Sequence, residues 1–482
     1  MLALGCVSPP CPVGYMRVGD RCEQVQQPDA GTDTGPAVEL CNGVDDDHDG
    51  VEDRDDPDAH ARCDEAAGAE STAVCGGEEC TPTSCSVGTG NCTSEPGCET
   101  DLTSTAEHCA TCGHACAWSC ESSECNDAVQ LAGGLDFHCA LRAGGTVVCW
   151  GRNSQGRLGD GTTLWRPRPV TVVNIADVVA ITAGQNFACA LRADESVSCW
   201  GTNERRELSA AARGLSYSPR PVQVFPTASG VQEVAAGQFH ACVRFASGRV
   251  SCWGENADGQ VGVGTFDSPI ADPTDVGLEG VVSLVSGGYH VCVLRSAGEV
   301  VCWGANSGGQ LGDGSALDRS APPDTAVPGL SARALALGGV HSCAITSSGQ
   351  VACWGQNDFG QLGSGSLRNA YVPTMPYLLD GVTSLALGDV HGCARVSEQL
   401  YCWGGNSSRQ VGVDSFEVLT EPTALSMVAG AVEVSGSMRN TCARLSTGHV
   451  TCWGDNSWGQ LGGGYRAAAP SASPVMVLPP TD

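Results

Sequence analysis

The tripeptide Cys-Trp-Gly occurs seven times in this chain of 482 residues, and no other feature constrains the fold as strongly. Steps of 49 to 53 residues separate the Cys residues of successive copies, which are Cys149, Cys199, Cys252, Cys302, Cys353, Cys402 and Cys452. Self-similarity at a fixed period of this length is typical of repeat architectures, in which each repeat packs on its neighbours. The pattern therefore predicts seven structural repeats over residues 129–482.

A Gly-rich turn sequence follows each tripeptide. An Asn stands two residues after the Gly of every copy: Asn153, Asn203, Asn256, Asn306, Asn357, Asn406 and Asn456. Most copies continue as Gly-Gln-Leu-Gly-x-Gly, as from Gly309 to Gly314. Gly supplies positive φ without a Cβ clash, and Asn tolerates the same backbone region while bonding its own backbone. We expect turns here and not phosphate-binding loops, because no helical pattern follows that could offer an N-terminus.

A second Cys precedes the first by ten residues, or by nine in the sixth repeat. These residues are Cys139, Cys189, Cys242, Cys292, Cys343, Cys393 and Cys442. A hairpin with a three-residue turn at 143–145 places Cys139 opposite Cys149, and a two-residue turn at 397–398 restores the same opposition in the shorter repeat. Opposed Cα atoms lie about 4.5 to 5.5 Å apart, within the range that a disulfide accepts. The spacing predicts seven disulfides rather than zinc sites, which need four converging ligands.

Each repeat has room for four short strands. Apolar and polar residues alternate between turns rich in Gly, Asn and Pro, and residues 129–482 show no sustained helical spacing. A Val or Leu stands two residues before each second Cys, so these two share one face of the strand and the Trp takes the other. Four strands per repeat, repeated seven times, predict an all-β fold: a seven-bladed β-propeller, whose closed ring removes exposed sheet edges.

The stretch from Gly287 to Gly314 resembles the repeat of the regulator of chromosome condensation family. Its strings are Gly-Gly-Tyr-His-Val-Cys-Val-Leu and Gly-Glu-Val-Val-Cys-Trp-Gly-Ala-Asn-Ser-Gly-Gly-Gln-Leu-Gly-Asp-Gly. The resemblance implies a seven-bladed propeller over residues 129–482. The family includes a chromatin-bound exchange factor for a small GTPase and a secreted inhibitor of β-lactamase, so the fold does not settle the function. One disulfide per blade and an acidic balance depart from the nuclear exchange factor.

Four histidines recur at one position, two residues before the first Cys of a repeat. They are His240, His290, His341 and His391, and the other repeats have Phe137, Phe187 and Asn440 there. Replacement by Phe indicates a packing role in place of catalysis or metal binding. The chain also has no Gly-x-Ser-x-Gly elbow, His-Glu-x-x-His helix or phosphate loop, so we expect that it is not an enzyme.

The second repeat has an irregular loop with three arginines. After Asn203 it loses the Gly pair and runs longer, and it carries Arg205, Arg206 and Arg213. Residues 129–230 hold 10 Arg against 7 acids, in a chain whose net charge is -29. Two interpretations stay open: a solvated insertion, or a contact loop for an acidic partner such as the chain's own N-terminal part.

The N-terminal part differs in composition from the repeats. Residues 1–128 hold 26 acids, 4 Arg and 15 Cys, which predicts an acidic, disulfide-rich and largely irregular region. We divide it into a start and linker (1–36), an acidic motif (37–64) and a Cys-rich module (65–128). The opening Met-Leu-Ala-Leu-Gly-Cys resembles the processing site of a bacterial lipoprotein, which predicts lipidation of Cys6 on a truncated start.

The acidic motif matches the spacing of a calcium loop. Positions 1, 3, 5, 9 and 12 of that loop are Asp45, Asp47, Asp49, Asp53 and Asp56, and Gly50 takes position 6. Hard carboxylate oxygens around a sharp Gly turn favour calcium over a merely solvated acidic turn, with copper through His48 as a further alternative. The segment also resembles the metal-binding motif of secreted, repeat-rich bacterial proteins.

The Cys-rich module allows two interpretations. Cys109, Cys112 and Cys116, with His108 and His114, have the spacing of a zinc knuckle. In an oxidising compartment a disulfide framework is favoured instead.

The composition limits the partners and the compartment. All 25 basic residues are Arg, the net charge is -29, and no apolar run is long enough to span a bilayer, which argues against nucleic acid and membrane-spanning roles. A count of 29 Cys indicates an oxidising compartment. We expect a monomeric, non-enzymatic binding scaffold for a protein or cell-surface partner, outside the cell or on a bacterial outer membrane. The alternatives are an exchange factor for a small GTPase, a propeller enzyme or an enzyme inhibitor.

Overall fold

The computed structural model of the protein describes residues 124–375 and 379–480, residues 116–121, Cys109 and six short strands nearer the N-terminus. Those strands pair as two-stranded antiparallel sheets: β1 (Tyr15–Val18) with β2 (Arg21–Gln24), β3 (Thr72–Cys75) with β4 (Cys80–Ser84), and β5 (Thr89–Gly90) with β6 (Thr100–Asp101). A fourth such sheet joins β7 (Cys120–Glu121) and β8 (Glu124–Cys125). The chain divides into two compact units, residues 1–87 with 93–98 and residues 88–92 with 99–482, and the second unit contains the repeats.

Seven antiparallel sheets follow, one from each repeat. Blades 1 to 3 comprise β9 (Ala128–Gly133), β10 (Phe137–Arg142), β11 (Val147–Gly151) and β12 (Arg166–Thr171); β13 (Val178–Ala183), β14 (Phe187–Arg192), β15 (Val197–Thr202) and β16 (Tyr217–Phe225); and β17 (Val231–Ala236), β18 (His240–Phe245), β19 (Val250–Gly254) and β20 (Ile270–Asp275). Blades 4 and 5 comprise β21 (Val281–Ser286), β22 (His290–Arg295) and β23 (Val300–Gly304); and β24 (Ala332–Leu337), β25 (His341–Thr346), β26 (Val351–Gly355) and β27 (Ala370–Thr374). Blades 6 and 7 comprise β28 (Val382–Leu387), β29 (His391–Val396), β30 (Gln399–Gly404) and β31 (Leu419–Leu425); and β32 (Ala431–Gly436), β33 (Asn440–Leu445), β34 (Val450–Asn456) and β35 (Ala467–Met476). The predicted all-β, seven-bladed propeller is confirmed.

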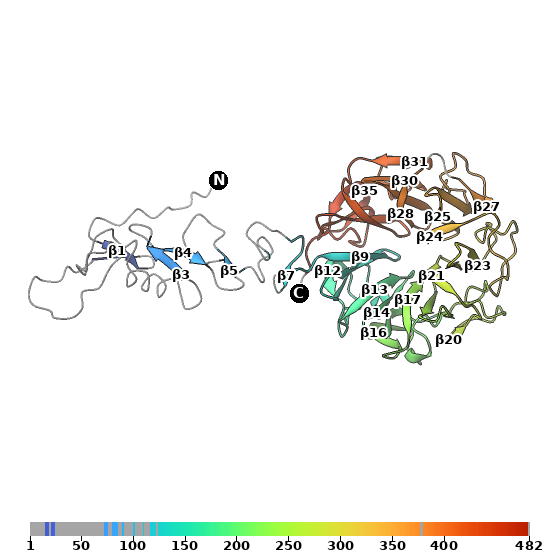
Figure 1. Ribbon diagram of the computed structural model, residues 1–482, viewed down its shortest axis with the longest axis horizontal. Helices are drawn as coiled ribbons and strands as arrows, with labels where there is room; N and C mark the ends of the chain where they lie inside the picture. The colour runs from blue at the N-terminus through green and yellow to red at the C-terminus, as the bar shows by residue number, and fades with distance from the viewer. Residues whose placement is uncertain are drawn as a thin grey trace, which may run out of the picture. The chain divides into compact units, whose positions relative to one another are not determined.

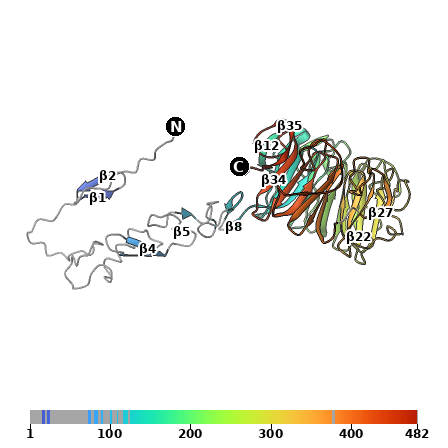
Figure 2. The ribbon, with the colours of Figure 1, turned by 90° about the horizontal axis from the view of Figure 1, so that it is seen from above.

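The seven sheets form a ring with the first strand of each blade nearest its centre (Figure 1). Figure 2 shows the ring from the side, with the strands running between its two faces. Blade 4 departs from the prediction of four strands, because it has three and only an isolated bridge from Gly304 to Arg319 in place of the fourth. Pro322 and Pro323 lie where the outer strand would pair. The outer strand β12 also contains two Pro, but at alternate positions, so that both can face away from the neighbouring strand. Two consecutive Pro place one of them on the pairing side, where it has no backbone N–H to donate to the ladder.

Every blade is built from one continuous segment, so no strand from one end of the ring completes a sheet at the other. The ring closes by packing between whole blades, where β32 and β33 of blade 7 contact β9 of blade 1. The Trp150 indole N–H of blade 1 also donates to the Gln460 carbonyl of blade 7, at 3.0 Å.

That indole bond is one of seven. In each blade the Trp of Cys-Trp-Gly donates from Nε1 to a backbone carbonyl of the preceding blade, over 2.8 to 3.1 Å. The pairs are Trp150 to Gln460, Trp200 to Arg157, Trp253 to Glu207, Trp303 to Gln260, Trp354 to Gln310, Trp403 to Gln361 and Trp453 to Gln410. All seven Trp side chains are fully buried. A buried indole N–H needs an acceptor, and here the acceptor ties two blades together.

The two faces of each blade are different, as predicted. Val147 and Cys149 of blade 1 lie in one apolar cluster with Trp200 of blade 2. Trp150, on the opposite face of blade 1, packs with Cys452 of blade 7. The core of the ring is therefore a series of seven similar interfaces, each with disulfide and aliphatic side chains on one side and an indole on the other.

All seven predicted disulfides are formed within their hairpins, between Cys139–Cys149, Cys189–Cys199, Cys242–Cys252, Cys292–Cys302, Cys343–Cys353, Cys393–Cys402 and Cys442–Cys452. In the shorter hairpin Val396 pairs with Gln399, which leaves the predicted two-residue turn. The Cα atoms of the bonded Cys lie 4.0 to 4.2 Å apart, closer than expected. The Cys pair is a non-hydrogen-bonded pair of the ladder, in which facing residues are closest.

The segment before the first blade is fixed to the ring. Cys116 is bonded to Cys125 and Cys109 to Cys120, so the disulfide interpretation of these four residues is confirmed over the zinc knuckle. Trp118 is 5% exposed and packs in the cluster between blades 7 and 1. Its backbone N–H donates to the carboxylate of Asp127 at 2.7 Å. In the described part of the chain no helix is long and apolar enough to cross a bilayer.

Candidate interaction face

The ring has two faces with different loops. On one face, the turns between first and second strands meet the loops between third and fourth strands, as where Arg152 N donates to Asp136 O at 2.8 Å. We call this the loop face. On the other face lie the disulfide hairpins and the connections between blades, as where Val178 N donates to Gly145 O at 2.9 Å. We call this the hairpin face.

Seven buried Asn side chains organise the loops of the loop face. Each Asn accepts from the backbone N–H five residues later, over 2.9 to 3.2 Å. In blade 4, Asn306 Nδ2 also donates to Ser315 O at 3.1 Å. The predicted turns are present, although none of the seven Asn uses the left-handed region: Asn153, for example, has a φ of -128°. The Asn closes the loop through its side chain, and the neighbouring glycines supply the left-handed turns.

Backbone hydrogen bonds join neighbouring blades at the mouth of the central channel on this face, between blades 1 and 2, 2 and 3, 3 and 4, 4 and 5, and 6 and 7. Each blade contributes to the mouth the residue four positions before its first Cys: Leu135, Gln185, Gln238, Gly288, Gly339, Asp389 and Met438. Leu135 N donates to Gln185 O, and Gln185 N to Gln238 O, at 2.9 and 3.0 Å. The backbone of the mouth is therefore held across five of the seven blade junctions, and its side chains differ from blade to blade.

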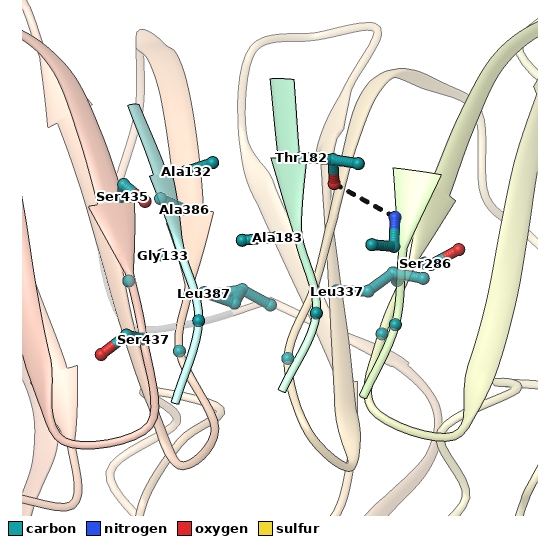
Figure 3. A pocket seen from close by; sticks show the side chains of 18 of the residues that line it. Ala132, Gly133, Thr182, Ala183, Ser286, Leu337, Ala386, Leu387, Ser435 and Ser437 are labelled. Atoms are coloured by element: carbon teal, nitrogen blue, oxygen red, sulfur yellow. Dashed lines mark hydrogen bonds between the residues drawn. The ribbon is translucent and has the colours of Figure 1, made fainter. Parts of the chain in front are cut away.

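A cavity of about 470 Å³ lies behind the mouth, enclosed by the first strands of all seven blades. Figure 3 shows that its wall is made mostly of small side chains, such as Ala132, Ala183 and Ser435. Thr182 on this wall accepts a hydrogen bond from Ala236 N at 3.1 Å, which joins blades 2 and 3. Among the residues lining the cavity, Asp389 is the only one with a charged side chain.

Asp389 takes part in a polar chain across the mouth. Gln238 Nε2 donates to Asp389 Oδ1 at 3.3 Å, and Gln185 Nε2 donates to Gln238 Oε1 at 3.3 Å. Gly339 leaves room for this carboxylate, because a Cβ there would lie 2.0 Å from Asp389 Oδ1. Burial raises the pKa of Asp389, and the positive charge of Arg439 acts against this rise. These three hydrogen-bonded side chains narrow the mouth of the channel.

Aromatic and acidic residues gather beside the mouth on blades 3 and 4. The rings of Phe239 and Tyr289 lie 6.2 Å apart, centroid to centroid. The pKa of Tyr289 is raised, first by burial and then by acidic neighbours that include Asp389. Arg205 forms an ion pair with Glu255 here, and its guanidinium carbon lies 5.9 Å from the centroid of Phe239.

The structure separates the three arginines that were predicted as one contact. Arg205 is committed to Glu255 and Phe239, although its side chain is 55% exposed. Arg206 is half-buried with a φ of 66°, and Arg213 is exposed beyond the short 3₁₀ turn Ala210–Ala212. Their role in binding a partner stays a prediction.

An acid–base cluster lies on the loop face at the seam between blades 7 and 1. Arg152 pairs with Asp136 at 3.4 Å. The pKa of Asp136 is raised, first by burial and then by Asp455, while Arg152 and Arg439 oppose the rise. Both acids are less than a tenth exposed. This seam is thus more highly charged than the cavity behind the mouth.

The recurring histidines occupy a packing position, as predicted. All four are fully buried, and burial lowers their pKa values to about 3 or 4. His290 Nε2 lies 2.8 Å from Ser342 Oγ of the next blade, and His391 Nε2 lies 2.8 Å from Thr441 Oγ1. Each ring fits over a Gly three residues earlier; a Cβ at Gly237 would lie 2.1 Å from His240 Cε1.

In three blades this position has a polar partner that was not predicted, one residue before the first Cys of the next blade. Ser342 and Thr441 are the partners of His290 and His391, and His138 is the partner of Asn440, whose Nδ2 lies 2.8 Å from the imidazole. The signal was present, since Ser342 and Thr441 replace the small or apolar residue of other repeats directly after a His-bearing blade.

The predicted calcium ligands Asp45, Asp47, Asp49, Asp53 and Asp56, with Gly50 and His48, lie outside the described residues. The predicted lipidation site Cys6 does too, as do Cys112, His108 and His114.

Seven blades joined by indole-to-carbonyl bonds define a seven-bladed β-propeller. Residues 102–394 match the RCC1-like domain, which covers more than half of the chain. The chain therefore belongs to the family of RCC1-like domains.

Individual relatives are distant. The chain is 28% identical over 268 residues to the ultraviolet-B receptor UVR8 of Arabidopsis thaliana, across 54% of this chain and 60% of that protein. It is 42% identical over 62 residues to the human E3 ubiquitin-protein ligase HERC2, of which it covers 1%. The chain thus spans less than two thirds of the length of these relatives.

Solved structures share the fold. Yeast RCC1 (Prp20), solved with Kap60, superposes with a TM-score of 0.62 at 23% identity, over 73% of this chain and 85% of that one. Human WBSCR16 gives a TM-score of 0.59 at 23% identity, over 65% and 85%. Identities this low show the fold alone.

Proposed function

We propose that the protein is a non-enzymatic binding scaffold that works outside the reducing cytosol and holds a protein partner on its loop face. One observation carries the proposal. The position two residues before the first Cys is fully buried in all seven blades, and only Phe, His or Asn occupies it. The adjacent position, on the loop face, holds Asp136, Asn186, Phe239, Tyr289, Val340, Val390 and Arg439.

This contrast separates framework from recognition. The framework repeats because every blade makes the same contacts with its neighbour. Loops on a rigid scaffold are free to vary, and that is where binding residues are concentrated in other proteins. The loop face also has the acids, arginines and aromatic rings described above, whereas the central cavity has one charged side chain.

The disulfides support the part of the proposal that concerns the compartment. Seven bonds inside short hairpins would be reduced in a cytosol that keeps thiols free, so the proposal includes secretion or surface display. Thiol alkylation in intact cells, followed by mass spectrometry, tests this part. Blade Cys residues that alkylate without a reductant would contradict it and favour the exchange-factor alternative.

Site-directed photocrosslinking tests the binding face. A photoreactive residue is placed at Leu164, which is 61% exposed on the loop face of blade 1, and in a control at Ser247, an exposed residue at a hairpin tip. We expect a defined adduct from Leu164 and none from Ser247. Adducts only from Ser247, or from neither position in the presence of the native surroundings, would contradict the loop-face scaffold.

Calcium binding in the acidic motif is a separate proposal that the sequence alone supports. Titration calorimetry of the full chain should show a weak site, about 10⁻⁴ to 10⁻³ M as in extracellular modules, that Asp45→Ala and Asp49→Ala each weaken. Absence of calcium heat would reject it.

A further inference from the structure

We propose that the loop face contacts its partner at the seam between blades 7 and 1, and that this surface takes an acidic polypeptide segment. The inference rests on the proposed function, because it names where on that face the partner lies and what chemistry it has. The surface, here the seam patch, consists of Arg152, Trp165 and Arg168 of blade 1 with Trp458, Tyr465 and Arg466 of blade 7.

Stacked rings and guanidinium groups form the centre of the seam patch. The guanidinium carbon of Arg466 lies 4.6 Å from the ring centroid of Trp165 and 5.1 Å from that of Trp458. Arg152 lies 4.8 Å from the centroid of Trp458. Cations within about 6 Å of an aromatic face are attracted by its quadrupole. The two guanidinium groups are therefore held in place before any partner arrives.

Arg466 has no acidic partner in the described part of the chain. Its Nε donates to Ser457 O at 2.7 Å, and no ion pair involves it or Arg168 among the described residues. Equivalent loops neutralise their arginines: Arg319 Nε donates to Asp313 at 2.7 Å. A planar guanidinium binds a carboxylate through two parallel hydrogen bonds. An unneutralised, oriented Arg thus favours a carboxylate from outside.

Arg168 lies beside this stack. Gly464 N donates to Pro167 O at 2.8 Å, which joins the loop of blade 7 to the outer strand of blade 1. A Cβ on Gly464 would lie 3.6 Å from Cγ of Arg168, so the Arg168 stem crosses the loop two residues from Arg466. The side chain of Arg168 is exposed and forms no ion pair or hydrogen bond within the described part of the chain. It adds charge to the patch without supporting the ring.

The patch composition favours a polypeptide partner over a glycan or nucleic acid. Trp, Tyr and Arg are the residues that dominate protein–protein hot spots, and Trp165 and Tyr465 are 43% and 49% exposed. Sugars and bases would stack on open aromatic faces, but guanidinium groups already cover faces of both Trp rings. The patch residues of blade 1 lie in the stretch 129–230, which holds 10 Arg against 7 acids in a chain of net charge -29, so an acidic segment is attracted more strongly here than to the rest of the chain.

Fluorescence titration of the full chain with poly-L-glutamate tests the inference. The seven Trp of the Cys-Trp-Gly tripeptides are fully buried, so quenching on addition of the polymer reports chiefly on Trp165 and Trp458 in the loops. We expect Arg466→Gln and Arg168→Gln each to weaken binding about tenfold, the loss of one charged hydrogen bond. Arg368→Gln is the matched control, since Arg368 is exposed on the loop face of blade 5 and has no ion pair among the described residues. It should change binding less than about twofold.

Three results would overturn the inference: no saturable binding, an equal loss in Arg368→Gln, or patch-dependent binding of polygalacturonate or heparin without binding of poly-L-glutamate. Arg168→Gln cannot act by unfolding the ring, and unchanged melting temperature verifies this. A Leu164 adduct that persists when Arg168 and Arg466 are both replaced would refute the seam patch but leave the scaffold function intact. If the photoreactive protein with Arg168 and Arg466 intact gives no adduct from the loop face, the scaffold function itself is refuted.

Discussion

Blades 3 to 7 and blades 1 and 2 make the same contact with different residues. The residue whose carbonyl accepts the indole N–H is Gln in five blades: Gln260, Gln310, Gln361, Gln410 and Gln460. In blades 1 and 2 it is Arg157 and Glu207. Gln310 Oε1 also accepts from Gly308 N at 2.9 Å, and Glu207 Oε2 reproduces this bond with Arg205 N at 2.8 Å.

The two charged exceptions are nearly fully buried. Burial raises the pKa of Glu207 to about 7, and burial lowers the pKa of Arg157 to about 9. Arg157 donates to Leu135 O at 3.1 Å and to Ser154 O at 3.0 Å. The difference teaches that the bond between blades depends on the main-chain carbonyl, so the side chain at this position can change. The cost of burying a charged side chain arises only in blades 1 and 2.

The largest effect should come from removing an indole. Trp303→Ala, next to Gln260, and Trp253→Ala, next to Glu207, should each lower the free energy of unfolding by about 3 to 5 kcal/mol, through the cavity and the lost bond. Denaturant midpoints measure this. Because the acceptor is a backbone carbonyl in both blades, the two losses should agree within about 1 kcal/mol. A much smaller loss of unfolding free energy in Trp253→Ala than in Trp303→Ala would show that the side chain at the carbonyl position does affect this contact.

The second largest effect should come from removing a disulfide, and its size should be the same in a blade with Gln at the carbonyl position and in blade 2. Replacing Cys292 and Cys302 of blade 4 by Ala removes a bond that closes a loop of sequence separation 10. The chain-entropy model gives a loss of about 2 to 3 kcal/mol. The same exchange of Cys189 and Cys199 in blade 2 is the matched control, and calorimetry should show equal shifts in melting temperature. A ring that no longer assembles in either variant would contradict independent hairpins.

Glu207→Gln should stabilise the protein, because it installs the residue of the five regular blades. The folded-state pKa of Glu207 is raised from 4.5 to about 7, so the folded state holds this proton more tightly and stability is lost as pH rises from 4.5 to 7. We expect a gain of about 2 kcal/mol at pH 8 and almost none at pH 4. Gln310→Glu is the converse control and should introduce the same pH dependence. Equal midpoints at pH 8 for Glu207→Gln and the unsubstituted protein would show that this carboxylate is solvated.

The smallest effect on stability is expected in the irregular loop. Arg206→Ser with Arg213→Ser should change the free energy of unfolding by less than about 0.5 kcal/mol, since neither residue forms an ion pair among the described residues. Arg205→Ser should cost about 1 kcal/mol, because Glu255 is 6% exposed and loses its partner. If the loop contacts an acidic partner, replacing all three should slow association and reduce its salt dependence. Unchanged association rates would leave the loop as a solvated insertion.

Sequence periodicity was enough to predict the fold. The Cys spacing alone gives the hairpin register, because side chains alternate with a period of two and one lost residue requires a different turn. It did not give the missing strand of blade 4, because Pro also occurs in the outer strands that do form. Nor did it give the conformation of Asn153, whose side chain acts on the backbone five residues away.

The candidate site was harder to predict than the fold. Trp165 and Arg466 are far apart in the sequence and meet only because blade 7 packs against blade 1. One signal was available, since Trp165 and Trp458 are the Trp residues of the propeller that lie outside Cys-Trp-Gly. The three arginines of the second repeat were chosen from local charge, which does not show that Arg205 is already paired with Glu255.

The continuity of each blade has a consequence for how such a ring can change over generations. A tandem duplication or deletion of one repeat, 49 to 53 residues long, adds or removes a whole sheet with its own disulfide and its own indole donor and carbonyl acceptor. No sheet is left with a strand from elsewhere in the chain. A copied blade would therefore bring its own hydrogen-bonding groups to both of its new neighbours, whichever residue it carries at the carbonyl position.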